Sequence, residues 1–240
     1  VSVMQAKNEI GTIQPVADSA RLVRAREVLF HTDAVQTFGH LPFTVGELGC
    51  DLLSVSAHKL YGPKGVGLLY VRKGTRIVPH MNGGEQEGGR RASTLNVPGI
   101  VGFGKAVELA LGTLAEEKAR LTALRDRLIG GLLGRLEGIR LNGHPTERLP
   151  NNVNVSVEGV DGEGMVLSLD LLGIAAATGS ACSSSNVAPS HVLAAIGLPE
   201  DPPQGSLRLS LGRDTTEGDI DAVLETLPEV VGRLRALAPG

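Results

Sequence analysis

The chain has 240 residues, of which 42% are hydrophobic and 20% charged, and its net charge is −3. These values are ordinary for a globular protein. Because no apolar run approaches the roughly 20 residues of a membrane span and no basic cluster stands out, neither a membrane nor a nucleic-acid partner is expected. Cys50 and Cys182 are too few for a disulfide framework or a zinc site, which favours the reducing cytoplasm.

The hydrophobic pattern predicts strands and helices in alternation along the chain. The expected strands cover residues 1–6, 28–31, 51–56, 65–72, 151–157, 173–176 and 206–210. The expected helices cover residues 15–27, a long stretch around 107–132, then 162–172, 190–196 and 215–237. Such alternation is typical of an α/β protein with a mainly parallel sheet covered by helices.

The pattern changes after the long helix, which predicts two domains. We expect residues 1–120 to form part of a large domain and residues 121–240 a small C-terminal α/β domain. The chain opens at Val1 with no turn or N-cap before the first apolar run. We therefore expect the sequence to be a fragment that begins inside a strand.

Polar residues follow several of the predicted strands. Asn8 comes after the first strand, Asp33 and Gln36 after the second, and His58 and Lys59 after the third. Because ligands of open parallel sheets bind beyond the carboxyl ends of the strands, these side chains are candidates for one binding site.

This set suits the cofactor pyridoxal 5'-phosphate (PLP), which needs a lysine for its Schiff base and an acid beside its pyridinium nitrogen. Lys59 is the natural lysine and Asp33 the natural acid, while Ser56 and His58 can donate to a phosphate and Gln36 to the ring oxygen. Taken singly, Asp33 is better explained as a turn or N-cap residue and Lys59 as a solvated lysine. The ordered set is more specific than any of its members.

Eight short segments carry a resemblance over the whole chain. They are residues 8–11 (Asn-Glu-Ile-Gly), 31–36 (His-Thr-Asp-Ala-Val-Gln), 54–65 (Ser-Val-Ser-Ala-His-Lys-Leu-Tyr-Gly-Pro-Lys-Gly), 83–87 (Gly-Gly-Glu-Gln-Glu), 90–94 (Arg-Arg-Ala-Ser-Thr), 150–155 (Pro-Asn-Asn-Val-Asn-Val), 179–183 (Gly-Ser-Ala-Cys-Ser) and 208–213 (Arg-Leu-Ser-Leu-Gly-Arg). In this order they resemble the cysteine desulfurases, in the NifS/IscS-like branch of the class-V aminotransferase family. The resemblance implies the fold of the fold-type I PLP-dependent transferases and a homodimer.

The resemblance also implies a role for each matching residue. Lys59 would carry PLP and move the Cα proton, Asp33 would pair with the pyridinium nitrogen, and Gln36 would bind the ring hydroxyl. The remaining implied contacts are Asn8 to cofactor and substrate, Ser56 and His58 to the phosphate, Thr94 to the phosphate of a partner subunit, and Arg208 to the substrate carboxylate, a task suited to a guanidinium.

Cys182 lies in a segment, residues 175–185, that is otherwise nearly all Ala, Gly, Ser and Thr. Without a bulky apolar anchor such a segment predicts an exposed, mobile loop, although free cysteine is usually a small buried hydrophobe. The resemblance implies that the Cys182 thiolate takes sulfur from L-cysteine as a persulfide, releases L-alanine and passes the sulfur to an acceptor such as an iron–sulfur scaffold. It implies no intrinsic metal site, only a transient iron–sulfur cluster at Cys182. Cys50 is expected to be structural.

The chain also departs from the family's pattern. Over a hundred residues usually precede the position of Asn8, including a phosphate-binding loop, so we expect weak PLP binding by this chain. Glu85 and Ser93 stand where the family usually has glycine, and we expect both to restrict the backbone of this loop, because residues other than glycine rarely adopt positive φ. Two alternatives stay open: another fold-type I enzyme, such as a selenocysteine lyase or an aminotransferase, or a truncated, non-catalytic subunit that only dimerises.

Overall fold

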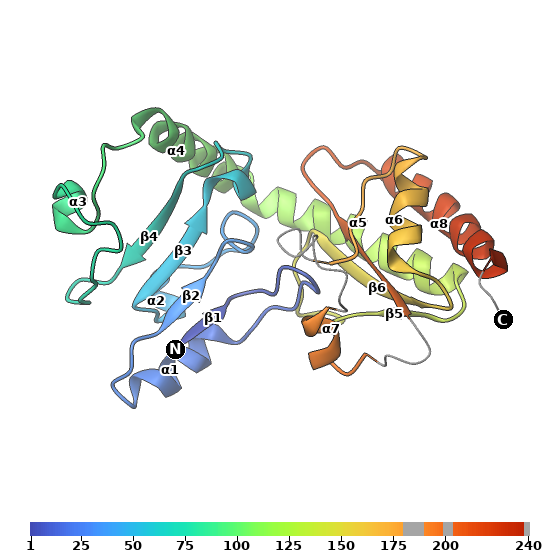
Figure 1. Ribbon diagram of the computed structural model, residues 1–240, viewed down its shortest axis with the longest axis horizontal. Helices are drawn as coiled ribbons and strands as arrows, with labels where there is room; N and C mark the ends of the chain where they lie inside the picture. Colours follow the sequence, from blue (N-terminus) through green and yellow to red (C-terminus); the bar gives the residue numbers. More distant parts are fainter. Residues whose placement is uncertain (180–189, 199–203, 238–240) are drawn as a thin grey trace. The chain divides into compact units, whose positions relative to one another are not determined.

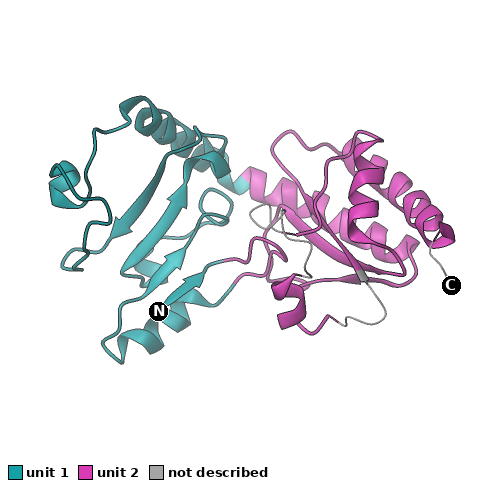
Figure 2. Ribbon diagram, in the orientation of Figure 1, with its two compact units in different colours: residues 1–5, 14–115 teal, residues 6–13, 116–240 magenta. Residues whose placement is uncertain are grey.

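The computed structural model describes residues 1–179, 190–198 and 204–237 (Figure 1). The chain divides into two compact units (Figure 2). The first contains residues 1–5 and 14–115, and the second contains residues 6–13 and 116–240. The short segment 6–13 thus leaves the first unit between two of its elements and packs with the second. Each unit is described below by itself.

The first unit contains a four-stranded sheet in the order β1-β2-β3-β4. Its strands are β1 (Ser2–Met4), β2 (His31–Asp33), β3 (Leu52–Ser56) and β4 (Gly67–Val71). β1 pairs with β2 and β2 with β3 in parallel, whereas β4 runs antiparallel to β3. The mainly parallel sheet and the α/β class are confirmed. The strand expected over residues 28–31 begins only at His31, since Val28 and Leu29 are exposed to solvent.

Short helical elements connect and cover this sheet. They are α1 (Val16–Arg24), α2 (Val45–Leu48), the 3-10 helix η1 (Ala57–Leu60), α3 (Gln86–Gly89) and α4 (Val97–Gly112). α2 begins with a capping box, in which Thr44 and Glu47 each satisfy the other's backbone N–H. α3 is a single turn inside the glycine-rich segment 82–90, and positive φ at Glu87 and Gly88 keeps it from continuing.

One face of the sheet forms the core of the first unit. Leu53 and Val55 of β3 are buried with Phe30, and they pack with Phe103 and Ala106 of α4. Because side chains alternate along a strand, the residues between these point to the other face. That other face carries the polar residues, which include Asp33 and Ser56. The alternation along the strands thus places the core residues on one face of the sheet and the candidate site residues on the other.

The second unit contains a three-stranded antiparallel sheet in the order β5-β6-β7. Its elements after the segment 6–13 are α5 (Leu114–Arg135), which starts two residues before the boundary, β5 (Ile139–Leu141), β6 (Asn152–Glu158), α6 (Gly162–Asp170), α7 (His191–Ala195), β7 (Gln204–Ser210) and α8 (Glu217–Leu237). The strand expected over residues 173–176 is wrong, because only Ala177 pairs there, in an isolated bridge to Arg208. The single long helix expected around 107–132 is two helices, which are separated at Thr113.

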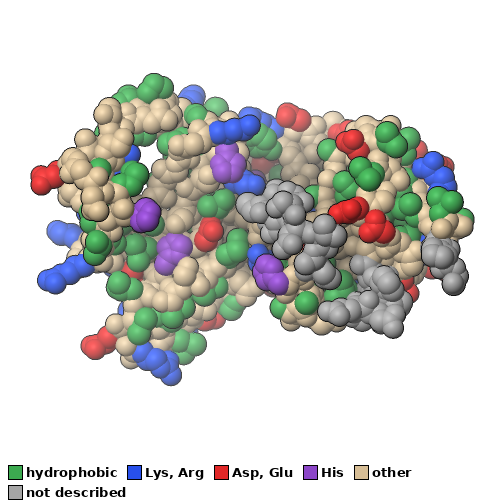
Figure 3. Space-filling view, in the orientation of Figure 1, with side chains coloured by type: hydrophobic (Ala, Val, Ile, Leu, Met, Phe, Trp, Pro, Cys, Tyr) green, Lys and Arg blue, Asp and Glu red, His purple; other side chains and the backbone are tan. Residues whose placement is uncertain are grey.

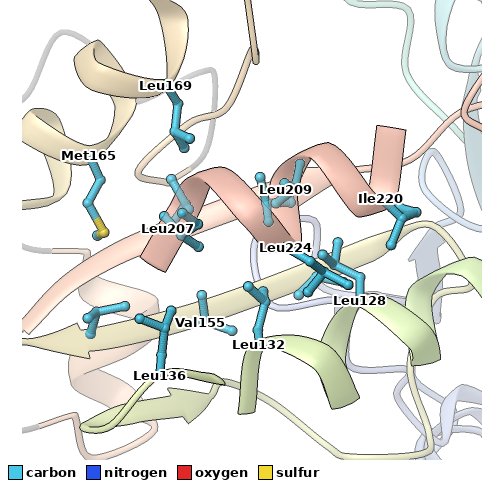
Figure 4. Close-up of a cluster of buried hydrophobic side chains, with 14 of the residues drawn as sticks. Leu128, Leu132, Leu136, Val155, Met165, Leu169, Leu207, Leu209, Ile220 and Leu224 are labelled. Atoms are coloured by element: carbon cyan, nitrogen blue, oxygen red, sulfur yellow. The ribbon is translucent and has the colours of Figure 1, made fainter. Parts of the chain in front are cut away.

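Helices α5, α6 and α8 enclose the apolar face of this sheet (Figure 4). Leu128 and Leu132 of α5 meet Leu224 of α8, while Leu207 of β7 and Met165 of α6 complete the layer. All of these side chains are at most 4% exposed. Among the described residues no single helix is both long and apolar enough to cross a membrane; α4 and α5 pass that test only when taken together as a bent pair.

Two adjacent leucines of α5 allow a direct test of this core. Leu132 is fully buried, whereas Leu133 is 44% exposed. We expect Leu132→Ala to lower the free energy of unfolding by about 2–5 kcal/mol, because it leaves a cavity in a closely packed layer. Leu133→Ala, the matched control, should change it by less than about 1 kcal/mol. Urea unfolding followed by circular dichroism measures both, and equal losses would contradict this description of the core.

Candidate functional site

The ends of β2 and β3 lie side by side in the first unit. The parallel register places Asp33 opposite Ser54, so the residues that follow both strands emerge at the same edge of the sheet. Asp33 is the last residue of β2 and Gln36 follows it, while Ser56 is the last residue of β3 and His58 and Lys59 follow it. The structure therefore brings together all five of the residues that the sequence assigns to the ends of these two strands.

Asp33 is held at the end of β2 by backbone contacts on both sides. Its Oδ1 accepts a hydrogen bond from the N–H of Val35 at 2.8 Å, and its carbonyl oxygen accepts from the N–H of Gln5 at 2.9 Å. The buried hydroxyl of Thr37 in turn donates to the side-chain oxygen of Gln5 at 2.6 Å. The turn that carries Gln36 is thus tied to the end of β1, and Gln5 and Thr37 are supporting residues that the sequence reasoning missed.

A row of polar side chains crosses the sheet at the level of His31, two residues before Asp33 in β2. The His31 ring hydrogen-bonds with Ser2 Oγ at 2.7 Å through Nδ1 and with Ser54 Oγ at 2.8 Å through Nε2. This row joins β1, β2 and β3 on the face that carries Asp33. It supports the register of the three strands from which the candidate residues emerge.

Lys59 lies in the 3-10 helix that follows β3 directly. Ser56 is the N-cap residue of this turn, and its Oγ hydrogen-bonds with Nδ1 of His58 at 2.7 Å. His58 and Lys59 are both exposed, and among the described residues no hydrogen bond or ion pair involves the Lys59 amine. A hydroxyl, an imidazole and an accessible amine therefore stand within four residues at the edge of the sheet.

The chain after Lys59 turns back sharply. Tyr61 adopts a left-handed conformation with φ of 60°, and the N–H of Gly62 donates to the carbonyl of Ala57 at 3.0 Å. A Cβ on residue 62 would stand 2.9 Å from that carbonyl oxygen, so this position requires glycine. The tight closure holds η1 in one turn and so restricts where Lys59 can project.

His40 is a further member of this neighbourhood that the sequence reasoning missed. Four of the six histidines lie in the first unit, and several are visible over it in Figure 3. Burial lowers the pKa of His40, and the positive charge of Lys59 lowers it further, although a hydrogen bond with the Phe38 backbone acts in the opposite direction. Its Nδ1 is buried without a partner among the described residues. His40 is therefore a neutral imidazole within the electrostatic reach of Lys59.

The loop that carries Thr94 is exposed, and one of the two departures from the family's glycine pattern matters for its backbone. Ser93 has φ of 79°, in the left-handed region that favours glycine. Glu85 has φ of −100°, which any residue adopts. The expected restriction thus applies to Ser93, next to Thr94, and not to Glu85.

The remaining candidates belong to the second unit. Asn8 and Arg208 meet there, since the Arg208 guanidinium donates to the carbonyl oxygen of Asn8 at 3.4 Å. The neighbouring Glu9 is only 2% exposed, and Gly179 lies against its carboxylate. Cys182 falls outside the described residues. Cys50, in contrast, is fully buried in the core of the first unit, where burial raises the pKa of its thiol, and its structural role is confirmed.

Comparison with known proteins places the whole chain in one group. Residues 1–223 match the family model described as aminotransferase class-V. The chain is 54% identical over its whole length to the cysteine desulfurase IscS of Methanosarcina thermophila and 51% identical to that of Dictyoglomus turgidum. It spans 59% and 61% of the length of these two relatives.

Solved structures agree with this grouping. A NifS-like protein superimposes with a TM-score of 0.88 at 41% identity, covering 98% of this chain and 61% of that one. The NifS-like protein of Rickettsia africae gives 0.87 at 31% identity, covering 97% and 61%. The resemblance inferred from the eight segments is confirmed, as is the fold of the fold-type I transferases.

The lowered pKa of His40 predicts how the first unit responds to acid. A histidine whose pKa is lower in the folded state than in the unfolded state adds stability above its unfolded pKa of about 6.5, and this contribution is lost as the pH falls through the folded-state value. We expect the free energy of unfolding to drop between pH 7.5 and pH 5.5, and to drop less in His40→Gln. Urea titrations at both pH values measure this. The exposed His80→Gln is the control, and an identical pH dependence in wild type and His40→Gln would refute the assignment.

Proposed function

The chain belongs to the class-V aminotransferase family, and we propose that it acts as a PLP-dependent cysteine desulfurase. In this reaction the sulfur of L-cysteine passes to Cys182 and L-alanine is released. The observation that carries the proposal is the accessible Lys59 amine beside the Ser56–His58 pair, at the sheet edge that also carries Asp33. The names of the relatives, which are cysteine desulfurases over the full length of the match, support the choice of reaction.

The residues present fit the cofactor of this family, pyridoxal 5'-phosphate. A Schiff base needs an amine that is not committed to an ion pair, and the exposed Lys59 meets this requirement. A pyridinium nitrogen needs a fixed carboxylate, and Asp33 is oriented by the N–H of Val35. A phosphate needs neutral or cationic donors, which Ser56 and His58 supply. When bound, the cofactor supplies an electron sink for charge that develops at the substrate Cα.

We assign the other steps to side chains of this chain. The Lys59 amine accepts the Cα proton of the substrate and returns a proton later. The Arg208 guanidinium binds the substrate carboxylate, and Asn8 orients cofactor and substrate. Gln36 donates to the ring oxygen of the cofactor. The nearby His40, neutral because burial lowers its pKa, adds no competing positive charge beside Lys59.

The Cys182 thiolate carries out the sulfur transfer in this proposal. It attacks the substrate sulfur, so that an S–S bond forms while the C–S bond breaks. The electron pair of the broken bond stays with carbon, which is protonated to give alanine. Because the thiolate is the reactive form, the buried Cys50, whose thiol pKa is raised, is a poor substitute.

The proposal extends to the setting of the enzyme. We place it in the reducing cytoplasm, a setting compatible with the free buried thiol of Cys50. We expect a homodimer in which Thr94 reaches the phosphate of the partner subunit. The persulfide on Cys182 then passes to an acceptor, such as an iron–sulfur scaffold or a tRNA-thiolation protein.

Cofactor binding tests the role of Lys59. The chain spans about 60% of the length of its relatives. Any visible absorbance of lysine-bound cofactor should disappear in Lys59→Ala and persist in Lys64→Ala, the control in the next loop. If this absorbance persisted in Lys59→Ala, another lysine would have to carry the cofactor.

Persulfide mapping tests the role of Cys182. After incubation with PLP and L-cysteine, mass spectrometry of the active protein should locate the persulfide on Cys182, with one alanine formed for each sulfur transferred. We expect Cys182→Ser to abolish the persulfide and Cys50→Ser to retain it. With L-selenocysteine and a thiol reductant in place of L-cysteine, selenide release by a protein that forms no persulfide from L-cysteine would favour a selenocysteine lyase. Amino-group transfer to an added keto acid would favour an aminotransferase, and a folded dimer without PLP would favour a non-catalytic subunit.

A further inference from the structure

Strand β6 is buried on both of its faces, although one face is polar. Val153, Val155 and Val157 are 0% exposed and belong to the apolar core of the second unit. The alternating residues Asn152, Asn154 and Ser156 are 4%, 0% and 0% exposed. Burying an amide is costly unless its donors and acceptors are paired, so the partners of these side chains explain why the face is polar.

The two asparagines donate to a carbonyl of the segment 6–13. Asn154 Nδ2 donates to the carbonyl oxygen of Glu9 at 3.1 Å, and Asn152 Nδ2 donates to the same oxygen at 3.2 Å. Asn142 fixes the orientation of the Asn154 side-chain amide, because Asn142 Nδ2 donates to Asn154 Oδ1 at 2.7 Å. With its oxygen occupied by Asn142, the Asn154 amide directs its N–H toward Glu9.

The carbonyls on either side of Glu9 are held by other residues of the same unit. Arg208 donates to the carbonyl of Asn8 at 3.4 Å, and the buried Arg148 donates to that of Ile10 at 3.2 Å. The next residue, Gly11, approaches so closely that a Cβ there would stand 2.7 Å from Asn152 Oδ1. The backbone of residues 8–11 is therefore seated against β6 and fixed by side-chain donors.

The same strand also sets Arg208. Asn154 and Arg208 are Cα partners in the β6–β7 ladder. On its other side Arg208 exchanges backbone hydrogen bonds with Ala177, at 2.6 Å and 3.2 Å. Asn154 is thus connected to both parts of the proposed substrate site. Its side chain binds the carbonyl of Glu9, the residue after Asn8, and its backbone is the ladder partner of Arg208.

We propose that Asn154, assisted by Asn152, is a positioning residue that holds the backbone at Glu9 so that Asn8 stands at a set place beside Arg208. The polar face of β6 is a seat for the segment 6–13. The significance for substrate binding rests on the proposed function, whereas the seat itself is a property of the second unit alone.

Hydrogen exchange of the 240-residue chain tests the seat without any activity. The variants are Asn154→Ala and the matched control Ser156→Ala, which removes a buried polar group from the same face with no bond to residues 8–11. We expect faster exchange of peptides covering residues 6–13 in Asn154→Ala and unchanged exchange there in Ser156→Ala. Equal exchange of residues 6–13 in the two variants would overturn the proposal. Should Asn154→Ala not fold, Asn152→Ala gives the same comparison.

Steady-state kinetics with L-cysteine tests the consequence in the PLP-loaded protein. Displacement of Asn8 from Arg208 should lower kcat/KM by about tenfold to a hundredfold in Asn154→Ala, with a raised KM, while Ser156→Ala stays within about twofold. An unchanged KM in Asn154→Ala would contradict the proposed effect of Asn154 on substrate binding. A wild-type protein that forms no persulfide would refute the proposed function instead, and the exchange result would still decide on the seat.

Discussion

The double burial of β6 is the constraint on which the second unit depends. A strand whose two faces are both covered usually carries apolar residues on each, but here only the valine face does. The asparagine face has to find donors and acceptors inside the protein, and the backbone of residues 8–11 supplies the acceptors. This requirement explains why a segment encoded between β1 and α1 of the first unit packs with the second unit.

The first unit uses strand alternation in a related way. Leu53 and Val55 point into the core, whereas Ser54 and Ser56, one residue along, point to the face that carries Asp33. A shift of β3 by one residue would exchange the two sets. The core packing and the placement of the candidate site residues therefore depend on the same strand register. The hydrogen bonds of His31 with Ser2 and Ser54 favour this register as well.

The sequence predicted the elements best where alternation or helical spacing was strong. β3, β6 and α8 lie within two residues of their expected bounds. The break at Thr113 was missed because apolar residues continue on both sides of it, and β5 was missed because three residues are too few to show a period. The strand expected at residues 173–176 was wrong because this apolar stretch does not pair with β7; only the next residue, Ala177, does so, in an isolated bridge to Arg208.

The sequence likewise predicted some residues of the candidate site and missed others. Asp33, Ser56, His58 and Lys59 were found because each lies at the end of a strand or shortly after it, and strand ends are visible in a sequence. His40 was missed because its pKa depends on burial and on the charge of Lys59, which are tertiary properties. The asparagines of β6 were visible as part of a motif, but a sequence does not show which carbonyl an amide meets.

The asparagines on β6 contribute less to the stability of the core than to the selection of one arrangement of residues 8–11. Apolar residues of similar volume often stabilise a core as well as a buried polar network does. Valine at position 154 would fill space, yet it would leave the Glu9 carbonyl with one donor fewer and Asn142 Nδ2 with one acceptor fewer. Such a face could still pack against residues 8–11, but many slightly shifted arrangements would be nearly equal in energy. The directional bonds of Asn152 and Asn154 select one of them, and Asn8 needs that selection because its backbone carbonyl has to lie within hydrogen-bond distance of the Arg208 guanidinium.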